Sequence, residues 1–317
     1  MSERILVTGA SGFVGGQLIT RLVDQPAVEV RGAVRAKRQN NQSALVAVGE
    51  IDGDTDWSDA LQGQRVIVHT AARVHIMDDS AADPLTEFRR VNVAGTLNLA
   101  RQAVAAGIRR FVFISSIKVN GEQTVAGAYF TADDAPAPED PYGISKLEAE
   151  QGLQQIARET DMEVVIIRPP LVYGPGVKGN FASMIKLVER GLPLPLGAIH
   201  NRRSLVSLDN LVDLIITCID HPAAGNQVFL AGDGEDLSTS ELLRRVGVAM
   251  GKPARLLPVP AAVLQFGATI LGKKAMAQRL LGSLQVDISK TREVLAWQPP
   301  VSVDEGLRRC FRNNRDE

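Results

Sequence analysis

The chain has 317 residues, 45% of them hydrophobic, and a formal net charge of −1, so it is long and apolar enough to fold around a large core. Lys and Arg (35) nearly balance Asp and Glu (36), and no long run of one charge occurs. This balance excludes a polyelectrolyte tail and gives no sign of nucleic-acid binding, so we expect a globular protein that acts on a small molecule.

Location and membrane contact are predicted from three features. Met1 leads directly into a strand pattern without a secretory leader, and Cys218 and Cys310 are far apart in apolar surroundings. We therefore expect reduced thiols, no metal site and a cytoplasmic protein. The apolar segment 261–272 contains Gln265 and is shorter than the roughly 20 residues of a spanning helix. It predicts an amphipathic or core helix, with a peripheral membrane contact as the less favoured alternative.

Strand-like and helix-like segments alternate through the first half of the chain. The predicted strands are 5–8, 28–34, 66–71, 111–115 and 164–168, and the predicted helices are 15–23, 84–106 and 142–159. This alternation predicts an α/β fold, a Rossmann-type doubly wound parallel sheet covered by helices on both faces. Ligands of such a sheet bind beyond the carboxyl ends of the strands.

The amino-acid composition changes after Arg168. Proline and glycine crowd residues 169–179, and a helix is predicted at 181–190. We expect a dinucleotide-binding domain over 1–168 and a smaller, mainly substrate-binding lobe over 169–317. The strand-like segments 204–206 and 227–230 could belong to either part.

A glycine turn follows the first predicted strand and opens a helix. Glycines spaced three apart let the backbone approach a pyrophosphate, whose charge lies at the positive end of the helix. A plain loop is the alternative, but the strand before and the helix after the turn favour a dinucleotide. The expected contacts are Gly9, Ser11, Gly12, Phe13, Val14 and Gly15.

The residue after the second predicted strand bears on the choice of cofactor. An acidic residue there would hold the adenosine ribose of NAD, but this chain has Arg35, followed by Lys37 and Arg38. An arginine can pair with a 2′-phosphate, so NADP(H) is favoured, and NAD(H) is the alternative. Glu50 and Ile51, near the end of the third strand, are expected to contact the adenine.

Tyr142 and Lys146 form the strongest catalytic candidate. Asp140 is expected to cap a helix that begins at Pro141, which puts the tyrosine and the lysine one turn apart on one face. An ammonium nearby is expected to lower the pKa of the phenol from about 10, and a shift of about three units corresponds to about 4 kcal/mol. An ordinary exposed helix is the alternative.

A hydroxyl is predicted at the same sheet edge. Ser116, after the strand 111–115, could hydrogen-bond the reacting oxygen and share its proton with Tyr142. The hydroxyl of Ser115 could fill the same role equally well on chemical grounds.

Together these residues resemble the extended short-chain dehydrogenase/reductase family, which includes nucleotide-sugar epimerases, dehydratases and 4-ketoreductases. The likeness also covers His69-Thr70-Ala71-Ala72, Asn92-Val93-Ala94-Gly95-Thr96, Arg168-Pro169 and Val172-Tyr173-Gly174-Pro175. It implies that Ser116, Tyr142 and Lys146 are catalytic, that Lys146 also binds the nicotinamide ribose, and that Ala71 and Ala72 contact the cofactor. Asn92 would be either structural or part of a proton relay.

The resemblance also implies a UDP-sugar substrate. Asn180 lies where relatives contact the sugar nucleotide, and Arg203 matches an arginine that binds its diphosphate, for which a solvated loop residue is the alternative reading. Arg279 is a further candidate for the phosphates, and Ser116 and Lys118 for the sugar. Relatives often pair through the helices that contain Asn92 and Tyr142, which implies a homodimer.

One departure from the family pattern and one closer likeness narrow the predicted reaction. Family dehydratases carry an Asp-Glu pair after the catalytic hydroxyl, where this chain has Ile117 and Lys118, so dehydration is not expected. The pattern over 168–181 most resembles bacterial 4-ketoreductases that form UDP-N-acetylquinovosamine for surface polysaccharide. The leading hypothesis is reduction of a UDP-2-acetamido-2,6-dideoxy-4-keto-hexose. A UDP-sugar 4-epimerase and a non-catalytic dinucleotide sensor are the alternatives.

Overall fold

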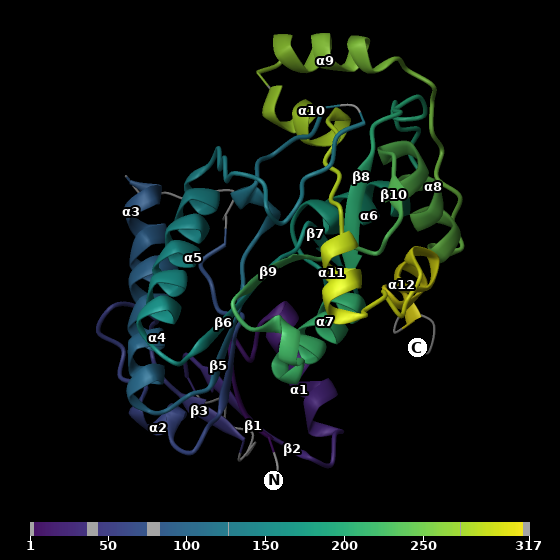
Figure 1. Ribbon diagram of the computed structural model, residues 1–317. Coiled ribbons are helices and arrows are strands. Elements are labelled where there is room, and N and C mark those ends of the chain that lie inside the picture. The colour runs from purple at the N-terminus through teal and green to yellow at the C-terminus, as the bar shows by residue number, and fades with distance from the viewer. Residues whose placement is uncertain (1–2, 37–43, 75–82, 126, 273, 313–317) are drawn as a thin grey trace.

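The computed structural model describes residues 3–36, 44–74, 83–125, 127–272 and 274–312. Within these ranges, seven parallel strands form one sheet in the order β3-β2-β1-β4-β5-β6-β9 (Figure 1). The strands are β1 Glu3–Thr8, β2 Val28–Val34, β3 Leu45–Ala47, β4 Val66–His69, β5 Arg110–Ile114, β6 Glu163–Arg168 and β9 Gln227–Leu230. All carboxyl ends therefore lie at one edge, and the predicted Rossmann-type sheet is confirmed.

Helices cover both faces of this sheet. On one face α1 (Phe13–Val23) and α7 (Leu208–Asp220) pack their apolar sides onto the central strands. On the other face α4 (Thr96–Ala105) and α5 (Pro141–Glu159) bury a second apolar layer. The strands are buried on both sides, which explains why they are continuous apolar runs in the sequence.

The helix predicted at 84–106 is interrupted. It consists of α3 (Pro84–Phe88), a π-helix η1 (Arg89–Gly95) and α4. A side chain at Gly95 would meet Ile51 at 2.7 Å, so glycine allows the loop after β3 to approach closely. The remaining short elements near the large sheet are α2 Ser58–Leu61, η2 Ile117–Val119, η3 Pro222–Ala224 and α11 Ser289–Leu295.

A second sheet of three strands, in the part of the chain that the structure describes, has the order β10-β8-β7. Its strands are β7 Leu171–Tyr173, β8 Arg203–Ser207 and β10 Asp236–Leu237, and the helices that share its apolar core are α6 Asn180–Glu189, α8 Thr239–Met250 and α12 Val303–Arg309. Of the two segments left open by the sequence, 204–206 lies in this small sheet and 227–230 in the large one. The large sheet therefore takes residues from both sides of Arg168.

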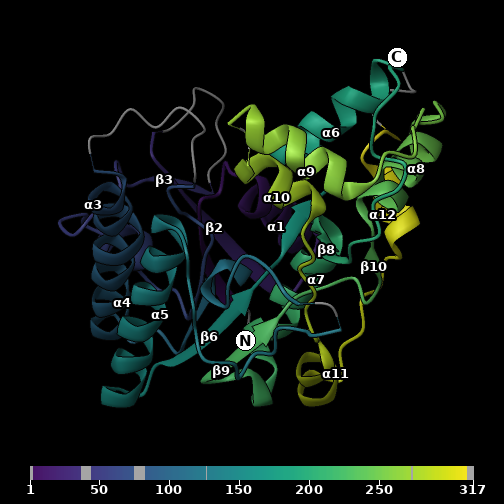
Figure 2. The same ribbon diagram turned by 90° about the horizontal axis from the view of Figure 1, so that it is seen from above.

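Two helices stand apart at the end of the molecule. Helix α9 (Ala261–Ile270) packs on α10 (Lys274–Leu281) and lies above the carboxyl edge of the strands in both ribbon views (Figures 1 and 2). Across the described ranges, no helix combines the length and the apolar character needed to cross a bilayer.

Candidate functional site

The glycine turn is shaped by close contacts that only glycine allows. Gly9 has a φ of +68°, and a side chain there would meet Ala71 N at 2.8 Å. A side chain at Gly15 would meet the carbonyl oxygen of Gly9 at 2.3 Å, and Gly12 N donates to that same oxygen at 2.8 Å. The turn is therefore compact and its backbone can approach a ligand.

Helix α1 begins at this turn with an open N-terminus. Gly12 is its N-cap and supplies no side-chain hydrogen bond, and the first turn contains no acidic residue. Gly12 and Ser11 are exposed, whereas Phe13 and Val14 are half-buried against the apolar core. Free N–H groups and the helix dipole at an exposed turn fit a pyrophosphate, so the residues present fit a dinucleotide.

The residues predicted to contact the adenosine lie together. Arg35 follows β2, and its guanidinium lies 3.6 Å from the Glu50 carboxylate, with both side chains largely exposed. Ile51 is next to Gly95 of the π-helix. Lys37 and Arg38, which also support the NADP(H) prediction, lie outside the described residues.

Helix α5 begins as the sequence predicts. The Asp140 carboxylate accepts a hydrogen bond from Gly143 N at 2.7 Å, and Pro141 is the first helical residue. The ammonium of Lys118 also contacts Asp140 and lies 2.8 Å from Glu122 Oε1. Lys118 was predicted to bind the sugar, and in this structure it ties the loop after β5 to the start of α5.

Lys146 is buried beneath the sheet edge. Its ammonium donates to the carbonyl oxygen of Ile114 at 2.8 Å and lies 4.3 Å from the centre of the Phe113 ring. Burial lowers the pKa of this lysine to about 7, although the Glu150 carboxylate acts in the opposite direction. The strand β5 thus fixes the position of the lysine.

The pKa of Tyr142 differs from the sequence-based expectation. Its pKa lies above the ordinary value, because burial and the negative charge of Asp140 both disfavour the phenolate. Its ring packs edge-on against Phe88 at 5.9 Å, and no described residue hydrogen-bonds its hydroxyl. The prediction of a lowered pKa was wrong for the protein without ligands, since spacing on a helix does not reveal desolvation.

The two serines after β5 have different surroundings. Ser115 is buried, and its hydroxyl donates a hydrogen bond to the Glu150 carboxylate. Ser116 is half-buried, and its Oγ accepts a hydrogen bond from Lys118 N at 3.2 Å. The hydroxyl of Ser116 can therefore still donate to a ligand, whereas that of Ser115 is already committed.

Glu150 organises a buried polar network that the sequence reasoning missed. Its carboxylate oxygens share one bifurcated hydrogen bond from Arg168 Nε and accept another at 2.5 Å from Arg168 Nη2. Arg168 Nη1 also donates to Asn120 Oδ1 at 3.0 Å. The available signal was a glutamate one helical turn after Lys146, a spacing that places both on one face.

Asn92 lies in the π-helix and links two segments. Its side-chain amide donates to Ser145 Oγ at 3.0 Å and to Arg73 O at 3.1 Å, and it accepts from Arg73 N at 2.8 Å. The loop after β4 is thereby attached to the helix that carries Tyr142. Nearby, His69 is buried between Thr8 and Thr96, and burial lowers its pKa to about 3.

Comparison with known proteins identifies the family of this chain. The model of the NAD dependent epimerase/dehydratase family matches residues 5–232. A relative from Vibrio cholerae, named UDP-glucose 4-epimerase, is 52% identical over 97% of this chain and 94% of its own length. The chain belongs to the NAD dependent epimerase/dehydratase family.

Solved structures of epimerases share the fold of this chain. The UDP-glucuronic acid 4-epimerase of Bacillus cereus, solved with NAD, superimposes with a TM-score of 0.76 at 22% identity and covers 96% of each chain. The UDP-glucose 4-epimerase of Thermotoga maritima, solved with UDP-glucose, superimposes with a TM-score of 0.77 at 22% identity. The superposition covers 98% of this chain and 99% of the Thermotoga maritima chain. The predicted family is confirmed, whereas the reductase subgroup stays a prediction.

Two arginines expected to bind phosphate in this epimerase/dehydratase chain meet at the end of α10. The Arg203 guanidinium donates to the carbonyl oxygens of Arg279 at 3.1 Å and Gly282 at 3.0 Å. Burial lowers its pKa, and no carboxylate of the described residues pairs with it. Arg279 thus adjoins Arg203 through its backbone. Asn180 starts α6, but its side chain lies outside the described part of the structure.

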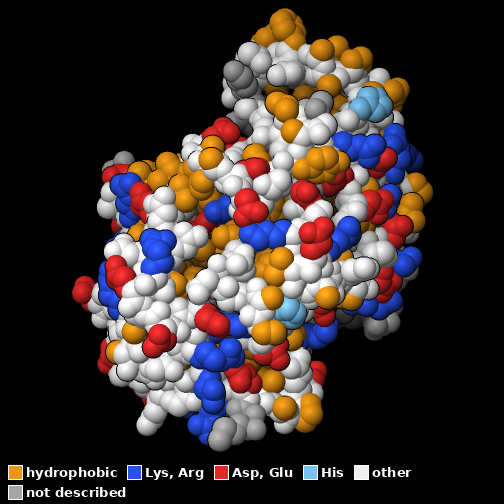
Figure 3. All heavy atoms as spheres, in the orientation of Figure 1, with side chains coloured by type: hydrophobic (Ala, Val, Ile, Leu, Met, Phe, Trp, Pro, Cys, Tyr) orange, Lys and Arg blue, Asp and Glu red, His pale blue; other side chains and the backbone are white. Residues whose placement is uncertain are grey.

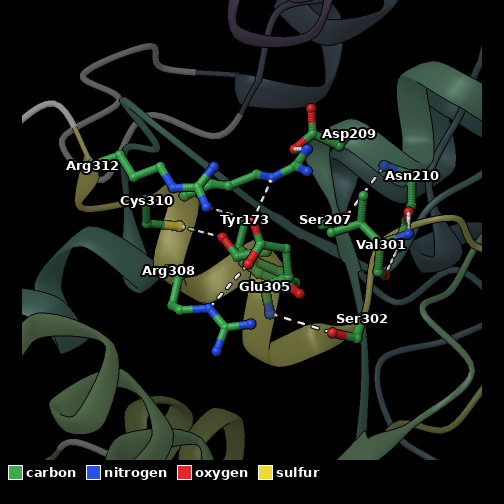
Figure 4. Close-up of polar contacts among 12 residues, drawn as sticks. Tyr173, Ser207, Asp209, Asn210, Val301, Ser302, Glu305, Arg308, Cys310 and Arg312 are labelled. Carbon is green, nitrogen blue, oxygen red and sulfur yellow. Dashed lines mark hydrogen bonds and ion pairs between the residues drawn. The ribbon is translucent and has the colours of Figure 1, made fainter.

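Tyr173, in the family motif Val172-Tyr173-Gly174-Pro175, is hydrogen-bonded to other residues of the protein. The Tyr173 hydroxyl donates to Asp233 Oδ2 at 2.7 Å, and Asp233 Oδ1 also accepts from Asn210 Nδ2. Figure 4 shows Tyr173 and Asn210 near helix α12, where Asn210 exchanges two hydrogen bonds with the Val301 backbone. This junction joins the small sheet to α7.

Proposed function

We propose that the chain transfers hydride at C4 of a UDP-linked hexose, in the direction that reduces a UDP-2-acetamido-2,6-dideoxy-4-keto-hexose. The observation that carries the proposal is the arrangement of Ser116, Tyr142 and Lys146 at the sheet edge that also holds the glycine turn. NADP(H) is the favoured cofactor, because Arg35 stands where an acid would select NAD. We further propose a homodimer that serves surface polysaccharide synthesis.

The protein's own residues handle the proton in this reaction. When bound, the nicotinamide supplies the hydride that C4 receives. The Tyr142 hydroxyl, kept protonated by burial, gives its proton to O4 as the carbonyl becomes an alcohol. Ser116 Oγ donates a hydrogen bond to the same oxygen, and the Lys146 ammonium, one turn along α5, stabilises the phenolate that remains.

The residues around the site support this division of roles. Ser116 keeps its proton available for O4, while Ser115 is held by Glu150. Arg203 has a guanidinium with carbonyl partners and no described carboxylate, which suits a diphosphate. Ile117 and Lys118 offer no acid for elimination of water.

The direct test is incubation with the 4-keto sugar nucleotide and NADPH or NADH, following the loss of nicotinamide absorbance and identifying the product by NMR. We expect cofactor consumption and a 4-hydroxy sugar, faster with NADPH. A protein that consumes neither cofactor with this substrate is not this reductase.

A UDP-sugar 4-epimerase is the second candidate, and the 52% identity to the Vibrio cholerae protein of that name favours it. The same three residues would first remove and then return the proton at O4. An epimerase would purify with NAD and convert UDP-glucose to UDP-galactose without added cofactor. That conversion, measured by NMR, separates it from the reductase.

A further inference from the structure

Helix α9 exposes large apolar side chains that the rest of the described chain does not cover. None of its residues is buried. Phe266 is 70% exposed and Ile270 69%, and Val263 and Leu271 are exposed beside them. Contiguous exposed apolar side chains of this size mark an interaction surface rather than ordinary surface scatter.

The two faces of α9 have different neighbours. Ala261, Leu264 and Ala268 are half-buried at helical spacing, and α9 packs on α10. Val263, Phe266 and Ile270 follow the same spacing on the side that is exposed. We call these three residues, with Leu271 and Leu257 next to the helix, the α9 apolar face.

The segment of the chain that carries this face has charges of one sign. No Asp or Glu stands between Glu241 and Asp287, whereas several Lys and Arg occur, of which Lys252 and Arg255 are exposed. In Figure 3 the end of the molecule that α9 forms shows hydrophobic side chains and no acidic ones. An apolar surface on an acid-free, basic segment matches anionic lipid headgroups above a hydrocarbon layer.

We propose that the α9 apolar face docks onto the surface of a bilayer that contains anionic lipids. A helix of ten residues is about 15 Å long, too short to span the hydrocarbon core of about 30 Å, so it lies in the interface plane. Its place above the carboxyl edge of the strands (Figure 2) would bring the catalytic site close to the membrane. The proposal does not depend on which sugar the enzyme uses.

The test is co-sedimentation of the full chain with vesicles of phosphatidylcholine alone or mixed with phosphatidylglycerol. We expect stronger binding to the mixed vesicles, and the double variant Phe266→Ser/Ile270→Ser should weaken it by at least about tenfold. The matched control is Val125→Ser/Val248→Ser, which removes two equally exposed apolar side chains elsewhere and should bind like the parent.

Three outcomes would overturn the proposal. One is no binding to either vesicle by the parent protein. Another is equal weakening by the two double variants. The third is a change from dimer to monomer in light scattering that is confined to the Phe266/Ile270 variant, because a second copy would then cover the face. Thermal melting checks that both variants are folded.

Discussion

Tyr142 and Tyr173 lie in different regions of the molecule, and their hydroxyl groups differ in whether they have a hydrogen-bond partner within the protein. Burial raises the pKa of both phenols. Tyr173 is fully buried and donates to Asp233, whose carboxylate is further held by Ser207 and Asn210. Tyr142 packs against Phe88, and none of the described residues bonds its hydroxyl. A satisfied phenol stabilises a junction, whereas an unsatisfied one, one helical turn from a buried lysine, is available to a substrate.

Tyr142→Phe should have the largest effect on activity and little on stability. Loss of the proton donor is expected to lower kcat/KM by about a hundredfold to ten-thousandfold, with cofactor affinity nearly unchanged. Steady-state kinetics and cofactor titration measure both. Tyr129→Phe, at an exposed tyrosine, is the control and should leave the rate unchanged. Near-normal turnover of the Tyr142 variant would contradict the mechanism.

Glu150→Gln should cause the largest loss of stability. Arg168 would stay buried without its charged partner, which typically costs about 3–5 kcal/mol. Denaturant unfolding measures this loss. The matched control is Glu148→Gln, two residues earlier, which breaks an exposed pair with Arg89 and should leave the midpoint nearly unchanged. Equal midpoints for the two variants would mean that burial of the pair is unimportant.

Tyr173→Phe should lower stability and leave activity nearly unchanged, which is the opposite of the result expected for Tyr142→Phe. Loss of one hydrogen bond to a buried carboxylate is expected to lower the free energy of unfolding by about 1–3 kcal/mol, because Ser207 and Asn210 still hold Asp233. Activity per folded molecule should persist. A folded but inactive Tyr173 variant would remove the distinction between the two tyrosines.

The pH dependence of stability should reveal the buried lysine. The pKa of Lys146 is about 7 in the folded protein and 10.5 in a model compound, so the unfolded chain binds more protons between these values. Stability should therefore rise with pH from about 7 to about 9, and Lys146→Met should flatten this rise. Above about 9 the raised pKa values of the Cys218 and Cys310 thiols act in the opposite direction. Chemical unfolding across this range is the measurement, and an unchanged slope in the variant would argue against a buried lysine.

The parts of this protein that sequence predicts well are those with local signals. Apolar runs indicate the strands, and the glycine turn and the Asp140-Pro141 start of α5 appear as expected. Ser116 could not be separated from Ser115 by sequence, because the difference depends on Glu150, 35 residues away on another element. The pKa of Tyr142 was missed for a similar reason, since burial depends on how the elements pack.

The small sheet was harder to foresee than the large one. Strand β10 has two residues and pairs with β8 across more than thirty positions, so no local alternation indicates it. The family resemblance marked Val172-Tyr173 and Arg203 as motifs, but it did not reveal that β7 and β8 pair. Long-range pairing of short strands is decided by tertiary contacts.

The π-helix at Arg89–Gly95 makes this enzyme sensitive to the removal of a single residue. Such a segment holds one residue more than a regular helix of the same rise, and here that extra residue lets Asn92 reach Arg73 and Ser145. Deletion of Val91 or Val93 would restore the regular ladder and rotate Asn92 away from both partners. We therefore expect a one-codon deletion to give a more regular helix that no longer attaches the loop after β4 to α5, a loss of structure that helix propensity alone would not reveal.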